Sequence, residues 1–61
     1  MTNDFVTTQW EVTKYGQMVE RSDIWIDGVA IITTKIYFYQ GKYYTELWES
    51  GYCIHFSEVL D

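Results

Sequence analysis

Each of the four glycines in this 61-residue chain is the second residue of a possible two-residue turn, and the chain has no proline. The four turn pairs are Tyr15-Gly16, Asp27-Gly28, Gln40-Gly41 and Ser50-Gly51. Type I′ hairpin turns need a positive φ angle at both central residues, which glycine adopts without steric cost. The positions of the glycines therefore predict a series of short antiparallel hairpins.

The segments between these turns have the composition of strands. They are rich in β-branched and aromatic residues, and no proline would interrupt their backbone hydrogen bonds. They cover residues 5–14, 17–26, 29–39, 42–49 and 52–57. We predict a single all-β domain over residues 1–61, folded as a five-stranded antiparallel meander with two-residue hairpin turns.

The predicted turns also fix which residues share a face of the sheet, because a two-residue loop sets the register of its hairpin. Pairing around the four turns places Val12, Val19, Ile36, Thr45 and Phe56 in one row across all five strands. The same register collects large apolar residues on one face, the predicted core face: Val6, Trp10, Val12, Val19, Trp25, Ala30, Ile32, Ile36, Phe38, Tyr43, Leu47, Tyr52, Ile54 and Phe56. The other face receives most of the charged and polar residues.

The predicted core face needs a cover, and no segment shows the 3.6-residue apolar period of a helix. Two arrangements remain open: the sheet curls into a small, partly open barrel, or it packs face to face against a second copy. The barrel resembles SH3-like barrels in the number and length of its strands. Because burial barely offsets conformational entropy in so short a chain, we expect a homo-oligomer, with a dimer favoured. Arg21 and Asp23 fall on the predicted core face, either buried or at a β-bulge.

Charge and composition exclude several classes of protein. Nine acidic residues against four basic ones give a net charge of −5, which disfavours binding to nucleic acid or anionic lipid. A single cysteine excludes an intramolecular disulfide framework and a zinc knuckle. No apolar run approaches the ~20 residues of a membrane span, and the first four residues do not resemble the start of an export signal. We therefore predict a cytoplasmic protein without metal or cofactor.

The polar face of the predicted sheet carries the candidate binding residues. Tyrosine and tryptophan are enriched in protein–protein hot spots, they stack on bases and sugars, and they also stabilise hairpins as cross-strand pairs. The charged side chains beside them form either a row that contacts a partner or a simple ladder of ion pairs. The predicted binding set consists of Tyr37, Tyr39, Tyr44, Trp48, Glu20, Lys35, Glu46 and His55.

Three residues near the C-terminus have side chains that occur in metal sites and nucleophilic sites: Cys53, His55 and Glu46. Side chains two residues apart on a strand stand about 6–7 Å apart, too far for a direct thiol–imidazole hydrogen bond. Tight hairpins also leave no long loop from which to build a pocket. We therefore predict no enzymatic activity and no metal site.

The function predicted from these features is a non-enzymatic protein-interaction module that binds another protein through its acidic, aromatic face. In size, acidity and all-β character it looks like the small accessory inhibitors that phages and mobile elements direct against host proteins. Its dispersed acidic residues would let it imitate nucleic acid in a basic groove of such a partner. The alternative is a small β-barrel that binds single-stranded nucleic acid or glycan by aromatic stacking.

Overall fold

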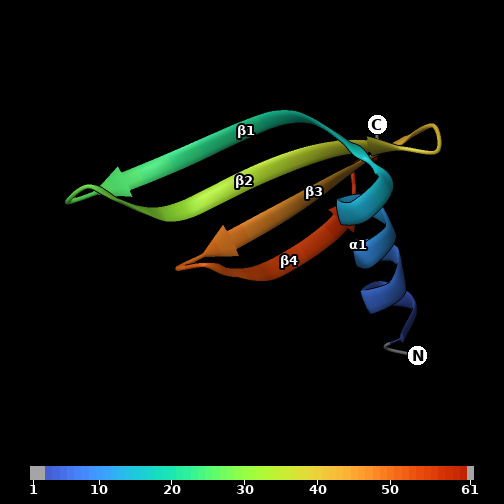
Figure 1. Cartoon of the computed structure of the whole chain (residues 1–61), viewed down its shortest axis with the longest axis horizontal. Coiled ribbons are helices and arrows are strands. Elements are labelled where there is room, and N and C mark those ends of the chain that lie inside the picture. Colours follow the sequence, from blue (N-terminus) through green and yellow to red (C-terminus); the bar gives the residue numbers. More distant parts are fainter. Residues whose placement is uncertain (1–2, 61) are drawn as a thin grey trace.

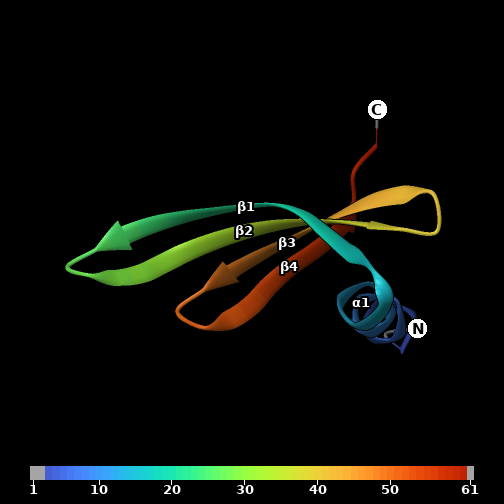
Figure 2. The ribbon, with the colours of Figure 1, turned by 45° about the horizontal axis from the view of Figure 1, so that its top comes forward.

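The computed structural model describes residues 3–60, which form one helix followed by four strands. The elements are α1 (Asn3–Tyr15), β1 (Gln17–Ile26), β2 (Val29–Tyr39), β3 (Lys42–Glu49) and β4 (Tyr52–Glu58). The strands make one antiparallel sheet in the order β1-β2-β3-β4, which is a meander. α1 precedes the strands in the chain and lies at the right-hand end of the sheet in Figure 1. α1 lies against one face of this sheet and is seen end-on in Figure 2.

Three of the four predicted turns are confirmed. In each, both central residues have a positive φ angle between 51° and 87°, as a type I′ turn requires. They are Asp27-Gly28, Gln40-Gly41 and Ser50-Gly51. The register of the β2–β3 hairpin is also the one predicted, with Ile36 opposite Thr45.

The predicted first strand is wrong, because residues 5–14 lie within α1. Asp4 in the first turn and Lys14 in the last turn each suit the helix dipole. The helix ends where the Gly16 N–H donates a hydrogen bond to the Val12 carbonyl, 2.9 Å away. A Cβ atom at position 16 would lie 2.5 Å from that same oxygen, so glycine is needed there for close approach and not for a hairpin.

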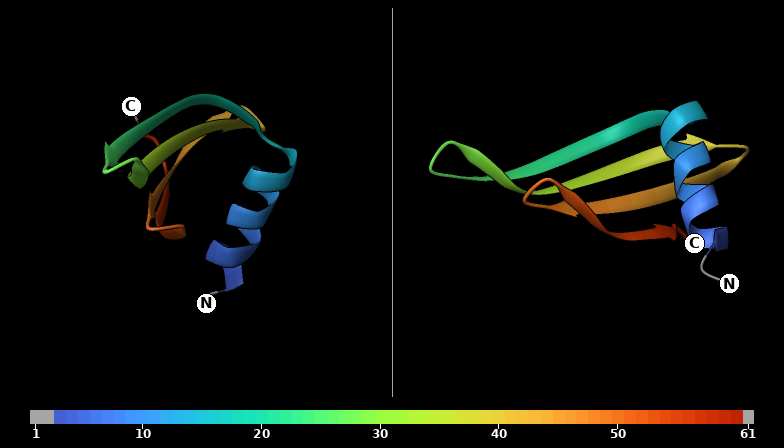
Figure 3. Two further views of the ribbon diagram at one scale, coloured as in Figure 1. Left: turned by 60° about the vertical axis from the view of Figure 1, so that its left-hand side comes forward. Right: turned by 60° about the horizontal axis from the view of Figure 1, so that its bottom comes forward.

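α1 packs across one end of the face that was predicted to be polar, and the predicted core face is left open. The sheet bends over the helix (Figure 3, left), and we call the covered side the inner face and the opposite side the outer face. On the inner face, Val12 of α1 packs with Tyr37 and Phe56, and these three are the buried apolar residues of the described chain. Tyr44 stacks on Phe56 with ring centroids 5.6 Å apart and ring planes 3° apart.

Register shifts explain which strand residues change face. Between β3 and β4 the register shifts between Leu47 and Trp48, so Phe56 pairs with Glu46 and not with Thr45. The β1–β2 pairing shifts twice, between Met18 and Glu20 and between Ile24 and Trp25. Between these two shifts Arg21 and Asp23 pair with β2 without interruption, so the β-bulge considered for these two residues does not lie there.

The sheet is open, with β1 and β4 at its two edges, so a closed or SH3-like barrel is not confirmed. Arg21 and Asp23 pair with β2 on the inner face, where Arg21 is exposed and Asp23 is half-buried. Within residues 3–60 no helix is long and apolar enough to cross a membrane.

Candidate functional site

Trp48 lies on the inner face near the end of β3, between Thr33 and Cys53 of the neighbouring strands, and its orientation is fixed by a buried carboxylate. Its indole N–H donates a hydrogen bond to Glu46 Oε1 at 3.0 Å, and the hydroxyl of Thr13 in α1 donates to Glu46 Oε2 at 2.8 Å. The Glu46 side chain is 0% exposed. Both carboxylate oxygens are satisfied, which a buried polar group requires. Helix and sheet together therefore hold the indole in place.

Lys35 reaches over the indole from the neighbouring strand. It pairs with Glu46 across β2 and β3, and its Nζ atom lies 4.4 Å from the centroid of the Trp48 ring. This distance is typical of a cation–π contact. Within residues 3–60 Lys35 forms no salt bridge, so its ammonium keeps hydrogen-bonding capacity for a bound group.

A second cation lies on the β1 side of the same face. The Arg21 Nε atom is 3.1 Å from Asp23 Oδ2, and Asp23 Oδ1 accepts a hydrogen bond from the Thr33 hydroxyl. The Thr33 hydrogen bond is the main reason that the pKa of Asp23 lies below its ordinary value, and Arg21 lowers it further. Asp23 is thus a fixed carboxylate that holds the guanidinium at the edge of the site.

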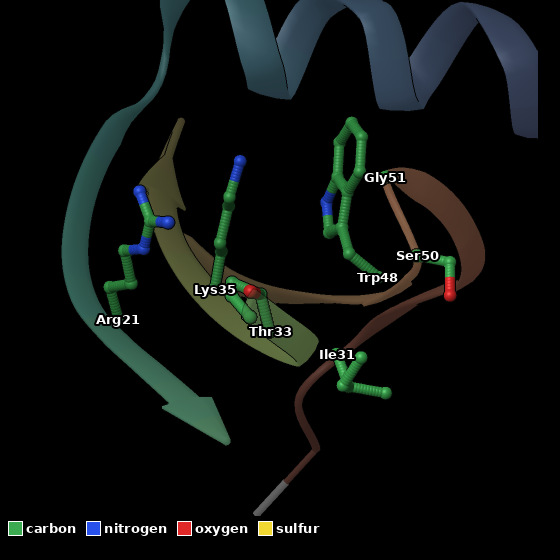
Figure 4. A pocket seen from close by; sticks show the side chains of 8 residues that line it. Arg21, Ile31, Thr33, Lys35, Trp48, Ser50 and Gly51 are labelled. Atoms are coloured by element: carbon green, nitrogen blue, oxygen red, sulfur yellow. The ribbon is translucent and has the colours of Figure 1, made fainter. Parts of the chain in front are cut away.

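These side chains border a hollow of about 230 Å³. Arg21, Thr33, Lys35 and Trp48 line it, together with the turn Ser50-Gly51. Figure 4 shows the Lys35 and Trp48 side chains extending toward α1. The turn is held by a hydrogen bond from the Ser50 N–H to the carbonyl of Ile31 in β2, 3.0 Å long.

A second hollow of about 320 Å³ lies between α1 and β3 and has mostly apolar walls. Val6 and Trp10, one helical turn apart, form its helix side together with Gln9 and Thr13, and Trp48 forms its sheet side. Trp48 therefore borders both hollows. We call the two hollows together the Trp48 groove: an apolar end at α1 and an end with two cations at β1 and β2.

Half of the predicted binding residues lie under or against the helix. Tyr37 and Glu46 are buried, while Tyr39 and Tyr44 are half-buried and pack against the core. Burial, more than any other effect, raises the pKa of Tyr37. These four side chains serve mainly to join the sheet to α1.

The other half is split between the two faces of the sheet. Lys35 and Trp48 border the groove, and Glu20 and His55 are exposed and pair with outer-face residues of the neighbouring strand. The eight predicted residues thus do not form one surface, and their role in binding stays a prediction. Sequence reasoning did not assign Arg21 or the helical pair Val6 and Trp10 to the site. The four-residue spacing of Val6 and Trp10 is typical of two residues on one face of a helix and could have indicated their shared position.

The cysteine, histidine and carboxylate near the C-terminus are not brought together. Cys53 pairs with Trp48 on the inner face, whereas His55 pairs with Leu47 on the outer face. The amide of Gln9 donates a hydrogen bond to the Cys53 sulfur at 2.8 Å, and burial raises the pKa of this thiol. Among residues 3–60 no group of three or more His, Cys, Asp or Glu side chains is placed to hold a metal ion.

Comparisons with protein-family models, with curated proteins and with solved structures found no match.

Proposed function

We propose that the protein is a non-enzymatic interaction module that binds a short segment of another protein in the Trp48 groove. The observation that carries the proposal is the position of Trp48, whose indole borders an apolar hollow on one side. On the other side it borders a hollow lined by Lys35 and by Arg21, which is paired with Asp23. A tryptophan held by a buried hydrogen bond loses little conformational entropy on binding, which is typical of an interface anchor.

The chemistry of the groove favours a particular kind of segment. Its helix end, with Val6 and Trp10, offers an apolar wall for one large apolar side chain. Its sheet end, with Lys35 and Arg21, holds two of the four basic residues of an otherwise acidic chain. An apolar residue followed by Asp or Glu complements both ends, because the carboxylate would meet the free ammonium of Lys35.

The proposed module also agrees with the location and the mode of action expected from the sequence. Such a module would act in the cytoplasm, where the single thiol of Cys53 stays reduced. It would work by occupying a partner's binding segment, as a small inhibitor of a host protein does. Binding of single-stranded nucleic acid or glycan on Trp48 is the alternative, but the net charge of −5 opposes phosphate.

The test is a titration of the full chain followed by the NMR signal of the Trp48 indole N–H. The probes are short peptides with a leucine or tryptophan next to Asp or Glu, the same peptides with Lys in place of the acid, and an oligothymidylate. We expect the acidic peptides to shift the indole signal. A shift with oligothymidylate alone would support the alternative, and no shift with any probe at millimolar concentration would refute the proposed function.

A matched pair of lysine variants distinguishes a direct contact between the peptide and Lys35 from an effect of the protein's net charge on binding. Lys35→Gln removes the ammonium over the indole, and Lys42→Gln removes an exposed ammonium at the start of β3 that lines neither hollow. We expect Lys35→Gln to weaken binding of the acidic peptides about tenfold, which corresponds to about 1.4 kcal/mol, and Lys42→Gln to leave it nearly unchanged. Equal effects of the two variants would contradict the assignment of Lys35.

A further inference from the structure

The outer face of the sheet is apolar along its middle, and no helix or strand of residues 3–60 packs on it. The pairing of the strands assigns apolar residues from all four strands to this face. Its apolar members are Ile24, Ile26, Val29, Ile32, Ile36, Phe38, Tyr43, Leu47 and Tyr52. Phe38 and Tyr43 pack on each other with ring centroids 5.0 Å apart. Six of these side chains remain between 38% and 75% exposed, and the other three are half-buried.

The whole chain exposes more surface than a compact monomer of its size. Its accessible area is 4671 Å², against about 4,200 Å² expected for 7.3 kDa. Its radius of gyration is 12.1 Å, against about 10.5 Å for a compact chain of 61 residues. Only three apolar side chains are buried within residues 3–60. A chain this short needs further burial to be stable, and the outer face is where apolar surface is left to bury.

We propose that two copies of this chain pair through their outer faces, with the apolar residues at the centre of the interface. The exposed parts of the six side chains amount to roughly 500 Å² of apolar surface, at the upper end for a patch on a monomer. A standard interface buries about 800 Å² from each partner. The backbone and the polar residues around the patch supply the remainder.

The arrangement of residues on this face suits a second copy. The middle strands β2 and β3 carry the apolar centre, and the edge strands β1 and β4 carry polar residues: Glu20, Ser22, His55 and Ser57. An apolar centre within a polar rim is the usual anatomy of an interface. The two central strands carry no positive charge on this face, so a two-fold axis brings no cations together there. A copy of the chain is also the one partner that is present whenever the chain folds.

The pairing is independent of the Trp48 groove, which opens on the inner face and stays accessible in such a dimer. Failure of the dimer would therefore leave the proposed function standing, and failure of peptide binding would leave the dimer standing.

The test is the mass of the full chain by light scattering and sedimentation from micromolar to submillimolar concentration. We expect twice 7.3 kDa, with dissociation on dilution. Ile24→Glu and Tyr52→Glu place a charge on the outer face at exposed side chains of two different strands. Each should raise the dimer dissociation constant at least tenfold while circular dichroism shows a folded chain. If one of them unfolds the chain, the other still decides.

The matched control is Val6→Glu, which makes the same kind of change at a 60% exposed residue of the helix. It should leave the dimer intact. A wild-type mass of one chain at the highest concentration would overturn the proposal. So would a dimer that survives both outer-face variants, because it would have to form elsewhere, such as along the open edge of β1.

Discussion

Truncation of two valines in α1 tests whether residues 3–15 pack as a helix on the inner face. Val12 is 0% exposed, whereas Val6 is 60% exposed. Val12→Ala removes two buried carbon groups, at about 0.8 kcal/mol each, and leaves a cavity. After allowance for the better helix propensity of alanine, we expect a loss of about 2 kcal/mol. Val6→Ala should change stability by less than about 0.5 kcal/mol, because its lost burial and its gained propensity nearly cancel.

The assay is urea unfolding of both variants and the wild type at one fixed protein concentration. The whole domain should be stable by only about 3–9 kcal/mol, so the Val12 effect is large. At a slope of about 1 kcal/mol per M urea, it lowers the midpoint by about 2 M. In a five-stranded meander both valines would lie on one core face and cost about the same. Equal losses in the two variants would therefore refute the helical packing.

Three further predictions concern polar groups of the inner face. Glu46→Gln should leave the free energy of unfolding in urea nearly unchanged. Glu46→Ala should lower it by at least about 2 kcal/mol, because the donors of Thr13 and Trp48 lose their acceptor. Equal stability of the two variants would contradict the role of Glu46 as the acceptor of both hydrogen bonds. Because the pKa of Asp23 is lowered in the folded state, its contribution to stability is present above the unfolded pKa and is lost as the pH falls through the folded pKa. Thr33→Val should raise the pKa of Asp23 toward its ordinary value and weaken this dependence, as measured by an NMR titration of the carboxyl carbon; an unchanged pKa would show that the hydroxyl is not its cause. The Cys53 thiol, whose pKa is raised by burial, should react with a disulfide reagent at pH 8 several times more slowly in the folded chain than in urea, and equal rates would argue against that burial.

The hairpins could be predicted from the sequence because their determinants are local. A two-residue turn with a glycine needs only its own backbone conformation, and it then fixes the pairing of the strands that it joins. The register of β2 and β3 around Gln40-Gly41 was correct for this reason. The bulged residues of β1 and β4 were not fixed by any turn, and the faces beyond them were misassigned.

The helix was not predicted from periodicity because polar residues interrupt the side that faces the sheet. Gln9 and Thr13 lie on this side among apolar residues such as Phe5 and Val12, so the apolar stripe is broken in the sequence. Its threonines and valines favour a strand when considered alone, and contacts with distant residues override that preference.

The same long-range contacts determine the candidate site. The fully buried Glu46 accepts a hydrogen bond from Thr13, 33 residues earlier in the chain. The register correctly placed Lys35 and Trp48 on one face of the sheet, since both face the same side of β2 and β3. Trp48 borders two hollows because of where α1 crosses the sheet. That position cannot be predicted from any local sequence pattern.

The central claim is that α1 packs on the inner face, which leaves Trp48 in a groove and the apolar outer face free. Nuclear Overhauser contacts between aromatic rings test it most directly. We expect contacts between Phe5 and Phe56, whose ring centroids are 5.5 Å apart, and between the Val12 methyl groups and Tyr37. Contacts from these helix residues to Phe38 and Tyr43 on the outer face would contradict it.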